Sequence, residues 1–311
     1  MKVLFLSHYF FPHVGGVEKH VYELSQKLRV EGCHVTVVTQ QYDLSLKSYE
    51  LVKGVRVVRF SYPPKKLLGI IHIWIYLWQH RKLIFMSDIV HIHDVFIWYL
   101  PFRLLFPTVK VFVTIHGLEW NNPFSRAGVW QKWLAVKFSK GSIGIGSFLE
   151  KYLNVKFDVV SYGAVRLTKF HFSRIRKNSV VFVGRLDEDT GILEFLGWIK
   201  KHLYFRVDFV GDGKYRGECK KYGTVYGFRK PNRFVQRAEY VVPGGYLACL
   251  EAMAMKRKIK VFWSNNLKQD YWQLSPMYKF ILGEDPSRAY RWVMKHSWEN
   301  LAKEYVKLWK K

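Results

Sequence analysis

The sequence predicts a mixed α/β protein made of two doubly wound, Rossmann-like domains, each with a mostly parallel sheet covered by helices. Short apolar runs of strand type alternate with amphipathic helix patterns, which is typical of parallel sheets with buried strands. This alternation occurs as two successive sets, which favours two domains. The expected strands are KVLFL, HVTVVTQ, VRVVRF, DIVHIHD, VKVFVTIHG, SIGIG and DVVSYG in the first set, then VVFVGRL, RVDFVGDG, TVYGF, EYVV and KIKVFW in the second.

The chain of 311 residues is long enough for two domains of about 100–200 residues each. We expect an N-terminal domain at 1–165 and a C-terminal domain at 166–290. The strand pattern is interrupted around residues 164–178, which indicates the boundary. Residues 291–311 are expected to form a C-terminal helix that can pack back on the N-terminal domain.

The chain is strongly basic, with a formal net charge of +26. Residues 1–165 hold 20 basic and 10 acidic residues, and residues 166–311 hold 30 and 14, so no single tail explains the excess. Such a balance indicates a polyanionic partner: a nucleic acid, an anionic membrane surface or a phosphorylated substrate. With 49% hydrophobic residues the chain can form full cores, which excludes a disordered protein.

The cellular location of the protein is predicted from its cysteines and its apolar segments. Three cysteines far apart in the sequence (Cys33, Cys219 and Cys249) fit a reducing cytoplasm better than a secreted disulfide framework. The first residues, MKVLFLSHYFFP, are interpreted as a strand and not as a signal peptide. The most apolar run, residues 67–78, is shorter than the roughly 20 residues that a membrane span needs.

A glycine pair follows the first strand. Gly15 and Gly16 precede a helix pattern that begins at Val17, and glycines at such a turn allow a ligand phosphate to approach the free amides of the helix start. The pattern is not G-x-G-x-x-G, so it does not indicate a dinucleotide site. A tight turn without a ligand is the alternative.

Histidines end two neighbouring strands. His116 follows the strand VKVFVTI, where an imidazole can hydrogen-bond a sugar hydroxyl or transfer a proton near neutral pH. His91 and His93 face the same side of the preceding strand and, with Asp94, resemble a metal pair. We interpret these three as structural and His116 as the functional candidate.

The segment 180–191, VVFVGRLDEDTG, is the most informative. An apolar strand ends at Gly184, and Arg185 stands just beyond it, where ligands bind to parallel sheets. A cation there, near a helix N-terminus, can hold a phosphate. Asp187 and Asp189 are interpreted as helix-capping and dipole residues, with a divalent-metal site as the alternative. A solvated arginine in an ordinary strand–turn–helix is the alternative for Arg185.

Two further glycine turns follow in the second half. Gly211 opens a Gly-Asp-Gly turn after the strand RVDFV. Tyr246 and Leu247 begin a helix that carries Glu251 in an otherwise apolar stretch. Because an unpaired buried carboxylate is unfavourable, vicinal sugar hydroxyls are natural donors to Glu251. A dipole-stabilising glutamate, or one paired with a lysine, is the alternative.

Together these segments resemble the retaining glycosyltransferases of family 4, which have the two-domain GT-B fold. The resemblance is carried by Pro12, Gly15, Gly16, Glu18, Leu24, Leu28, Gly32, His34 and Val35, and then by DIVHIHD, VTIHG, VVFVGRL, FVGDG and LEAMA in family order.

The resemblance implies transfer of a sugar from a nucleotide-sugar donor to an acceptor hydroxyl with retained configuration, without a metal or other cofactor. The donor would lie between the domains and be bound mainly by the C-terminal one. By position, Gly16 would meet the donor phosphates, His116 the transferred sugar, Arg185 the diphosphate and Glu251 the ribose. Gly15, Gly211, Tyr246 and Leu247 complete the implied donor site, with His116 and Arg185 as the catalytic candidates. The family has no agreed enzymic nucleophile, and none is assigned.

Three positions depart from the family pattern. Thr190 stands where the family has a second diphosphate-binding lysine, and Pro243 replaces the first of two glutamates. Ser161-Tyr162-Gly163 replaces the usual Pro-Asn-Gly. A different donor or a catalytically inactive GT-B subunit is therefore an alternative, and Lys214 or Arg216 is a candidate for the missing charge.

The apolar run 67–78 has basic flanks at Lys65, Lys66, Arg81 and Lys82. An amphipathic segment of this kind can lie on an anionic membrane, and Trp74 and Trp78 would enter the interface. We therefore expect a lipid-linked or glycan acceptor at the cytoplasmic face of a membrane. A core helix with solvated flanks is the alternative. A nucleic-acid-binding protein is a weaker one, because the aromatic residues fall inside strand and helix patterns.

Overall fold

Two compact units make up the computed structural model, which describes residues 1–61, 66–118, 125–167 and 174–311. The first unit comprises Met1–Ser161 with Trp298–Lys311, and the second comprises Tyr162–Ser297. The division precedes the expected boundary at residue 165, because the N–H of Val165 donates to the carbonyl of His296 within the second unit. Residues 168–173 of the expected boundary segment, and Lys65, lie outside the described residues.

Eight strands form the sheet of the first unit, in the order β3-β4-β2-β1-β5-β6-β7-β8. β3 is antiparallel to β4, and all the other neighbouring strands pair in parallel. The strands are β1 (Lys2–Ser7), β2 (His34–Gln40), β3 (Tyr49–Val52), β4 (Val55–Phe60), β5 (Ile89–His93), β6 (Val111–Ile115), β7 (Gly141–Ile145) and β8 (Val159–Ser161). β3 is not among the expected strands, because this edge strand has no buried residue and therefore no apolar run.

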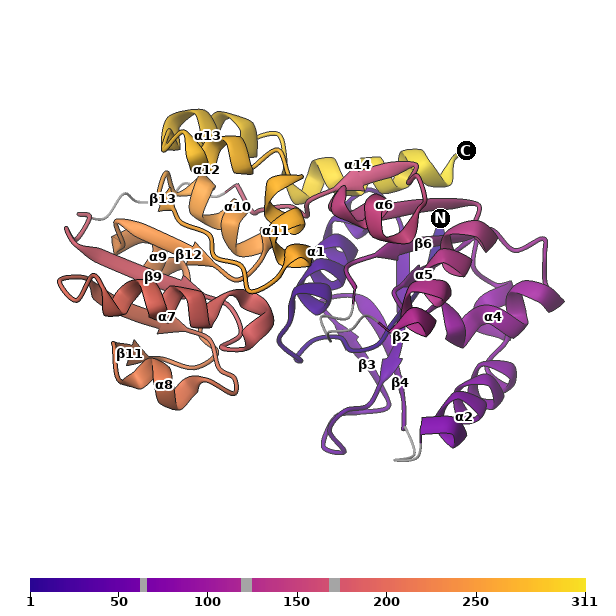
Figure 1. Cartoon of the computed structure of the whole chain (residues 1–311). Coiled ribbons are helices and arrows are strands. Elements are labelled where there is room, and N and C mark those ends of the chain that lie inside the picture. Colours follow the sequence, from indigo (N-terminus) through magenta and orange to yellow (C-terminus); the bar gives the residue numbers. More distant parts are fainter. Residues whose placement is uncertain (62–65, 119–124, 168–173) are drawn as a thin grey trace. The chain divides into compact units, whose positions relative to one another are not determined.

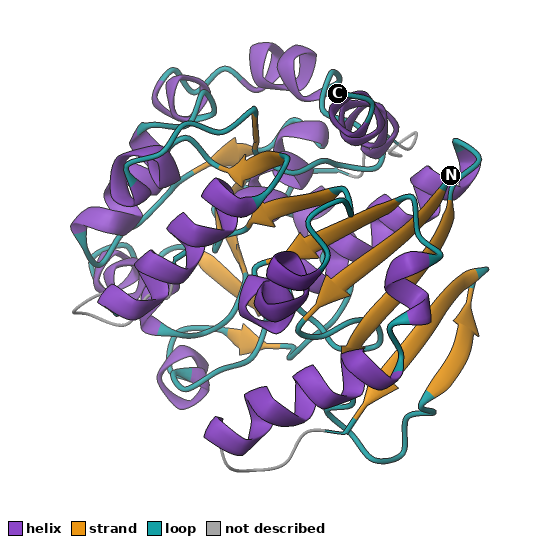
Figure 2. Ribbon diagram, turned by 90° about the vertical axis from the view of Figure 1, so that its right-hand side faces the viewer, coloured by secondary structure: helices purple, strands orange, loops and turns teal. Residues whose placement is uncertain are grey.

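Helices flank the strands on both sides (Figure 2). The helices of this unit are α1 (Gly16–Val30), α2 (Lys66–Gln79), α3 (Lys82–Phe85), α4 (Phe96–Leu105), α5 (Arg126–Phe138), α6 (Phe148–Leu153) and α14 (Trp298–Trp309). α2 packs on α4, and α4 packs on α5. Every residue of β5, β6 and β7 is buried, which is what strands covered on both faces require.

The C-terminal helix α14 belongs to the first unit although 136 residues of the second unit precede it in the sequence. It lies beside α1 (Figure 1). Its apolar positions 298, 301, 302, 305, 308 and 309 are buried, the spacing of one helix face. The expected helical end at 291–311 is therefore divided: α13 (Pro286–Val293) belongs to the second unit and α14 to the first.

Five strands form the sheet of the second unit, in the order β11-β10-β9-β12-β13 and all parallel. They are β9 (Ser179–Val183), β10 (Arg206–Val210), β11 (Thr224–Val225), β12 (Tyr240–Pro243) and β13 (Lys258–Ile259). The helices are α7 (Ile192–Lys200), α8 (Arg216–Lys220), α9 (Asn232–Arg237), α10 (Tyr246–Ala254), α11 (Asn266–Gln273), α12 (Tyr278–Leu282) and α13, with the 3₁₀ turn η1 (Glu188–Thr190) before α7.

Both sheets reverse their strand order at one point. In the first unit the reversal lies between β1 and β5, and in the second between β9 and β12. In open α/β sheets a ligand binds outside the carboxyl ends of the strands at such a switch point. The segments after Ser7, His93, Val183 and Pro243 are therefore where each unit is expected to bind ligands.

Candidate functional site

Arg185 follows β9 at the switch point of the second unit. Its guanidinium is about half exposed and forms ion pairs with two carboxylates of the next turn, Asp189 and, at 3.5 Å, Asp187. The side chain is therefore held close to its own loop while remaining accessible to solvent. A guanidinium fork in this position suits two oxygens of one anion.

Asp187 occupies the N-cap position of the short helix η1, and Asp189 lies in its first turn, where the sequence predicted helix-start residues. The Asp187 side chain makes no cap bond to η1; its Oδ1 accepts the backbone N–H of Lys214 at 2.9 Å instead. The α-helix begins only at Ile192, after a left-handed Gly191. The two carboxylates therefore tie Arg185 and the turn after β10 together, which a local sequence pattern does not reveal.

Thr190, which stands in place of the family lysine, is a structural residue. It is buried, and its hydroxyl oxygen lies 2.6 Å from the carbonyl oxygen of Asp187 and 3.0 Å from that of Arg185. The hydroxyl proton bonds to these carbonyls and closes the loop that carries Arg185. The family pattern suggests a missing charge at this position, whereas in the folded protein the Thr190 hydroxyl holds the loop closed.

Gly211 allows a close backbone approach. A Cβ atom at this position would lie 1.8 Å from the carbonyl oxygen of Gly184, so no other residue fits without movement of the backbone. The turn after β10 is thereby packed against the end of β9. Of the two cations considered there, Arg216 pairs with Asp212, and Lys214 lies over the ring of Tyr215 at 5.5 Å from its centroid.

The start of α10 is closed by a tyrosine pair. The rings of Tyr246 and Tyr271 stack at 3.7 Å, and the Tyr246 amide donates to the Tyr271 hydroxyl at 2.6 Å. Tyr246 therefore has a packing function, and its amide is already bonded. The side chain of Leu247 packs near Gly163, and Glu251 is half-buried on the same helix.

Lys268 is a residue of this site that sequence reasoning missed. It lies in the first turn of α11, is buried, and donates from Nζ to the carbonyl of Gly244 at 2.8 Å. Burial lowers its pKa to about 7, while the charges of Asp189 and Arg185 respectively raise and lower it. A signal was present: a cation in the first turn of a helix opposes the helix dipole.

In the first unit, Gly15 is the N-cap residue of α1 and Gly16 begins the helix. A Cβ atom at Gly15 would lie 2.1 Å from the carboxylate of Glu18, whereas one at Gly16 would meet open space. Glu18 also bonds His13 at 2.9 Å. Gly15 thus makes room for an internal carboxylate, and Gly16 leaves the helix start accessible.

His116 is fixed by two polar contacts. Its backbone N–H donates to Asp94 at 3.0 Å, and its Nε2 lies 3.0 Å from Nδ1 of His93. Asp94 has a left-handed backbone (φ 63°) and also contacts Lys132 at 3.4 Å. Burial holds the pKa of His116 well below its usual range, so the ring is neutral at physiological pH. Asp94, which the sequence grouped with the two structural histidines, thus positions His116, and Lys132, which the sequence did not single out, contacts Asp94.

His91 and His93 are fully buried, which agrees with their structural interpretation. His91 Nε2 lies 2.7 Å from the hydroxyl of Thr114, whose oxygen lies 2.8 Å from that of Tyr305 on α14. Among the residues that the structure describes, no group of three or more His, Cys, Asp or Glu side chains is arranged to hold a metal ion.

The two tryptophans of α2 have different environments. Trp78 is about half exposed, with Arg81 over its ring at 5.0 Å, whereas the indole N–H of Trp74 donates to the carbonyl of Ile97 at 3.0 Å. Lys82 at the start of α3 is exposed. Among the described side chains of α2, the exposed apolar ones are Leu68, Ile71, Ile75 and Trp78, a spacing of one helix face. No helix in the described part of the chain is long and apolar enough to cross a membrane.

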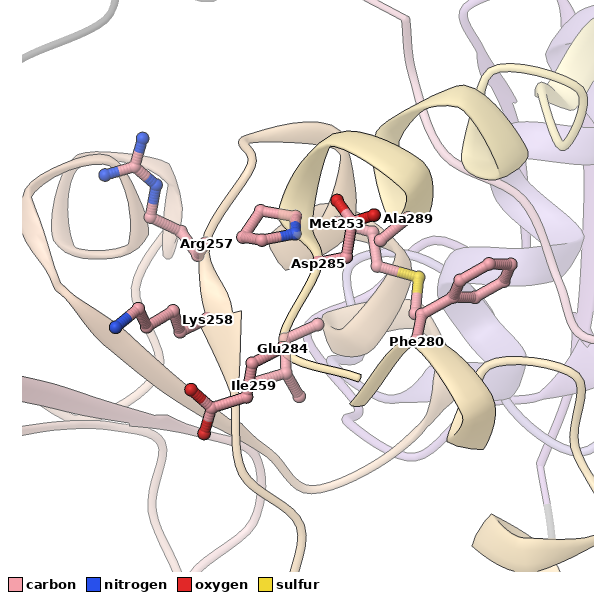
Figure 3. A pocket seen from close by; sticks show the side chains of 9 residues that line it. Met253, Arg257, Lys258, Ile259, Phe280, Glu284, Asp285 and Ala289 are labelled. Carbon is pink, nitrogen blue, oxygen red and sulfur yellow. The ribbon is translucent and has the colours of Figure 1, made fainter. Parts of the chain in front are cut away.

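A small pocket in the second unit lies beside the edge strand β13 (Figure 3). It is lined by Met253, Arg257, Lys258, Ile259, Phe280, Glu284, Asp285, Pro286 and Ala289. None of the predicted site residues contributes to it. Because β13 is at the edge of the sheet and β9 at its centre, this pocket is separate from the switch point that carries Arg185.

Comparison with known proteins gives a family match for the first unit. Residues 14–158 match the family model Glycosyltransferase Family 4. No curated protein matches the chain. The fold resembles that of sucrose-phosphate synthase from Thermosynechococcus elongatus, with a TM-score of 0.76, 16% identity and coverage of 99% of this chain and 98% of that one.

Two other solved structures are similar over their full length. The lipopolysaccharide outer core galactosyltransferase WaaB has a TM-score of 0.67 at 12% identity, with 99% of each chain covered. An alpha-glucosyltransferase solved with UDP and a 13-mer DNA has a TM-score of 0.64 at 11% identity, with 100% of each chain covered. The family model thus matches residues 14–158, which lie in the first unit, and the two-sheet fold of the whole chain is the GT-B fold of these glycosyltransferase structures.

Proposed function

We propose that the chain transfers a sugar, of hexosyl type, from a nucleotide-sugar donor to an acceptor hydroxyl with retention of configuration and without a metal ion. The observation that carries this proposal is the accessible guanidinium of Arg185 at the switch point of the second unit, between the carboxyl ends of β9 and β12. A nucleoside diphosphate has the charge and the paired oxygens that suit it.

Each site residue has a proposed role that follows from its chemistry. Arg185 offsets the negative charge that develops on the diphosphate as the glycosidic bond breaks. Glu251 accepts hydrogen bonds from the ribose hydroxyls. His116 remains neutral because burial lowers its pKa, so it hydrogen-bonds the transferred sugar without adding a charge. Gly16 leaves the start of α1 open to donor oxygens.

The direct test is donor turnover by the purified protein. A panel of UDP-, GDP- and ADP-sugars is screened by thermal stabilisation, because a ligand that binds only the folded state raises the melting temperature. The stabilising sugar nucleotide is then assayed for release of the nucleoside diphosphate with and without a chelator. Activity that a chelator abolishes and a divalent ion restores would contradict metal independence. Stabilisation without turnover on any acceptor would favour an inactive GT-B subunit.

We further propose a lipid-linked acceptor, reached by docking of the first unit on the cytoplasmic face of a membrane. The exposed apolar face of α2, formed by Leu68, Ile71, Ile75 and Trp78, supports this docking. Phe85 and Met86, which follow α2 in the sequence, are also exposed, as are Leu104 and Leu105 of α4, the helix that packs on α2. Between residues 65 and 140 the sequence has ten basic and three acidic residues. Apolar side chains with basic neighbours match an anionic lipid surface, at about 1 kcal/mol per cation.

A DNA acceptor is the alternative that the +26 charge allows, since the similar alpha-glucosyltransferase was solved with DNA. The two acceptor classes are separated by a competition experiment. Anionic vesicles and duplex DNA are offered together at equal phosphate concentration. Retention by vesicles supports a membrane acceptor, and retention by DNA overturns it.

A further inference from the structure

The feature behind this inference is Lys268, a buried lysine of the second unit. Its side chain reaches the switch point from α11, a helix that follows β13 and is far in sequence from Arg185. Nζ donates to the carbonyl oxygen of Gly244, directly after β12. Gly244 in turn lies against the end of β9: a Cβ atom on Gly184 would be 2.9 Å from the Cα atom of Gly244. The ammonium is therefore fixed at the junction of the two central strands.

Neighbouring residues hold both the backbone and the side chain of Lys268 in place. Asn265 caps α11, and its Oδ1 accepts the Lys268 amide at 2.8 Å. The ammonium then lies 4.4 Å from the centroid of the Tyr271 ring and 5.4 Å from that of Trp272. Tyr271 also bonds the amide of Tyr246, so the same helix shapes the start of α10. These contacts hold one rotamer of a side chain that is otherwise flexible.

A lysine in this place is unfavourable for the unliganded fold. Only 2% of its surface is exposed, so its charge has lost its hydration. The charged and titratable groups around it include Arg185 and Asp189 from the loop after β9 and Tyr271 from its own helix. Arg185 repels it, and Asp189, which attracts it, already binds Arg185. An anion bound beside the ammonium would favour its charged form.

We propose that Lys268 is the second diphosphate-binding cation of this enzyme, supplied by α11 in place of a lysine at position 190. The inference rests on the proposed nucleotide-sugar donor. Arg185 and Lys268 would contact the diphosphate from the ends of β9 and β12. The diphosphate would compete with Asp189 for Arg185 and would replace the attraction of Asp189 for the ammonium.

If Lys268 binds the diphosphate, binding should change the number of protons that the protein holds, in addition to depending on this lysine for its affinity. At pH 8 the free lysine is mostly neutral, since its pKa is about 7. A bound diphosphate raises that pKa, because an anion favours the charged ammonium. At pH 8 the diphosphate itself is fully ionised. Binding should therefore take up a proton from the buffer, which a structural lysine would not do.

The experiment measures binding of UDP, GDP and ADP by titration calorimetry at pH 8 in two buffers of different ionisation enthalpy. The variants are Lys268→Met, which keeps the length and apolar packing, and Lys268→Arg, which keeps the charge. Lys230→Met is the matched control, because Lys230 is exposed and lies in the same unit. The melting temperature of each unliganded variant is measured alongside.

Lys268→Met should bind the preferred nucleoside diphosphate about 10- to 100-fold more weakly, as expected for a lost charge-assisted contact, and should take up no proton. Lys268→Arg should retain most of the affinity, again without proton uptake. Unchanged affinity and uptake in Lys268→Met, or a lower melting temperature with unchanged affinity, would overturn the assignment while the donor proposal stands. Wild-type protein that binds none of the three nucleotides would overturn both.

Discussion

Trp309 donates its indole N–H to Nδ1 of His91 at 2.9 Å, and this bond joins the end of the chain to the central strand β5. An indole can only donate, so Nδ1 of a neutral His91 must be the acceptor. The proton of His91 is therefore on Nε2, directed at the hydroxyl of Thr114. The chain continues through Tyr305 to Nε2 of His20 at 3.0 Å. One donor on α14 thus sets the direction of a buried hydrogen-bond chain.

Trp309→Phe is expected to lower the free energy of unfolding by about 1–3 kcal/mol. The substitution keeps an aromatic ring but leaves the buried Nδ1 of His91 without its donor. Urea denaturation measures the loss. The control is Trp130→Phe, because Trp130 is exposed on α5 and its change should stay within about 0.5 kcal/mol. Equal effects of the two substitutions would show that the bond contributes nothing.

Acidification is expected to destabilise the first unit. Burial lowers the pKa of His20 to about 3, and those of His91, His93 and His116 well below the usual value. Below pH 6.5 the unfolded chain binds protons that the folded unit does not, so the stability present above pH 6.5 is lost as the pH falls toward 3. Each group contributes up to about 1.4 kcal/mol per pH unit.

Urea denaturation at pH 7.5, 6.5 and 5.5 measures this dependence. His34→Gln, at an exposed position on β2, is the control and should leave the slope unchanged. Stability that does not change between pH 7.5 and 5.5 would contradict the neutral state of the buried histidines.

Arg185→Ala is expected to weaken nucleoside-diphosphate binding by about 2–3 kcal/mol, as for the loss of a charge-assisted contact. The substitution should change the free energy of unfolding only slightly, because the Arg185 side chain is half exposed and its ion pairs with Asp187 and Asp189 lie at the surface. Calorimetry measures the affinity. Arg206→Ala is the control, since Arg206 is exposed at the opposite, amino end of β10. Unchanged affinity in folded Arg185→Ala would remove Arg185 from the donor site.

Thr190→Lys would tighten nucleoside-diphosphate binding if only the missing charge mattered, which is what the sequence suggests. The structure leads to the opposite expectation. The Thr190 side chain is buried and its hydroxyl closes the Arg185 loop, so a lysine there loses those bonds and buries a charge. We expect a lower melting temperature and weaker binding, compared with Thr190→Ser, which keeps the hydroxyl. Tighter binding would show that the loop tolerates a second cation.

Trp78→Ser is expected to reduce co-sedimentation with anionic vesicles without unfolding the protein, because the Trp78 ring is half exposed. Trp74→Ser should instead lower the melting temperature, because its indole bonds the carbonyl of Ile97. Wild-type binding should rise with anionic lipid and fall with salt, since salt screens exposed charges beyond about 10 Å at 0.1 M. Leu44→Ser, at an exposed site before β3, is the control. Equal binding to neutral and anionic vesicles would count against docking by charge.

The sequence-based prediction was accurate where the signal was local. Buried parallel strands such as β9 and β6 are apolar runs that end in a glycine or a polar residue, so both sheets and the position of Arg185 could be read from the chain. The prediction was wrong where the hydrogen-bond partner of a residue lies far away along the sequence. Asp187 makes no side-chain cap bond to η1, and its Oδ1 instead accepts the amide of Lys214, 27 residues away. The edge strand β3 has no buried residue and therefore no apolar run to recognise.

The amino-acid sequence by itself determined the two α/β domains, the order of their strands along the chain and the cation that follows β9, because each depends on periodicity and on residue type within a few positions. Only the tertiary structure decided that Thr190 serves through its hydroxyl, that Lys268 reaches the end of β12, and that Trp309 on α14 sets the tautomer of His91. The physical reason is the same in each case. A buried polar group takes whichever partner the folded backbone brings within hydrogen-bonding distance, and for Lys268 and Trp309 that partner is 24 and 218 residues away.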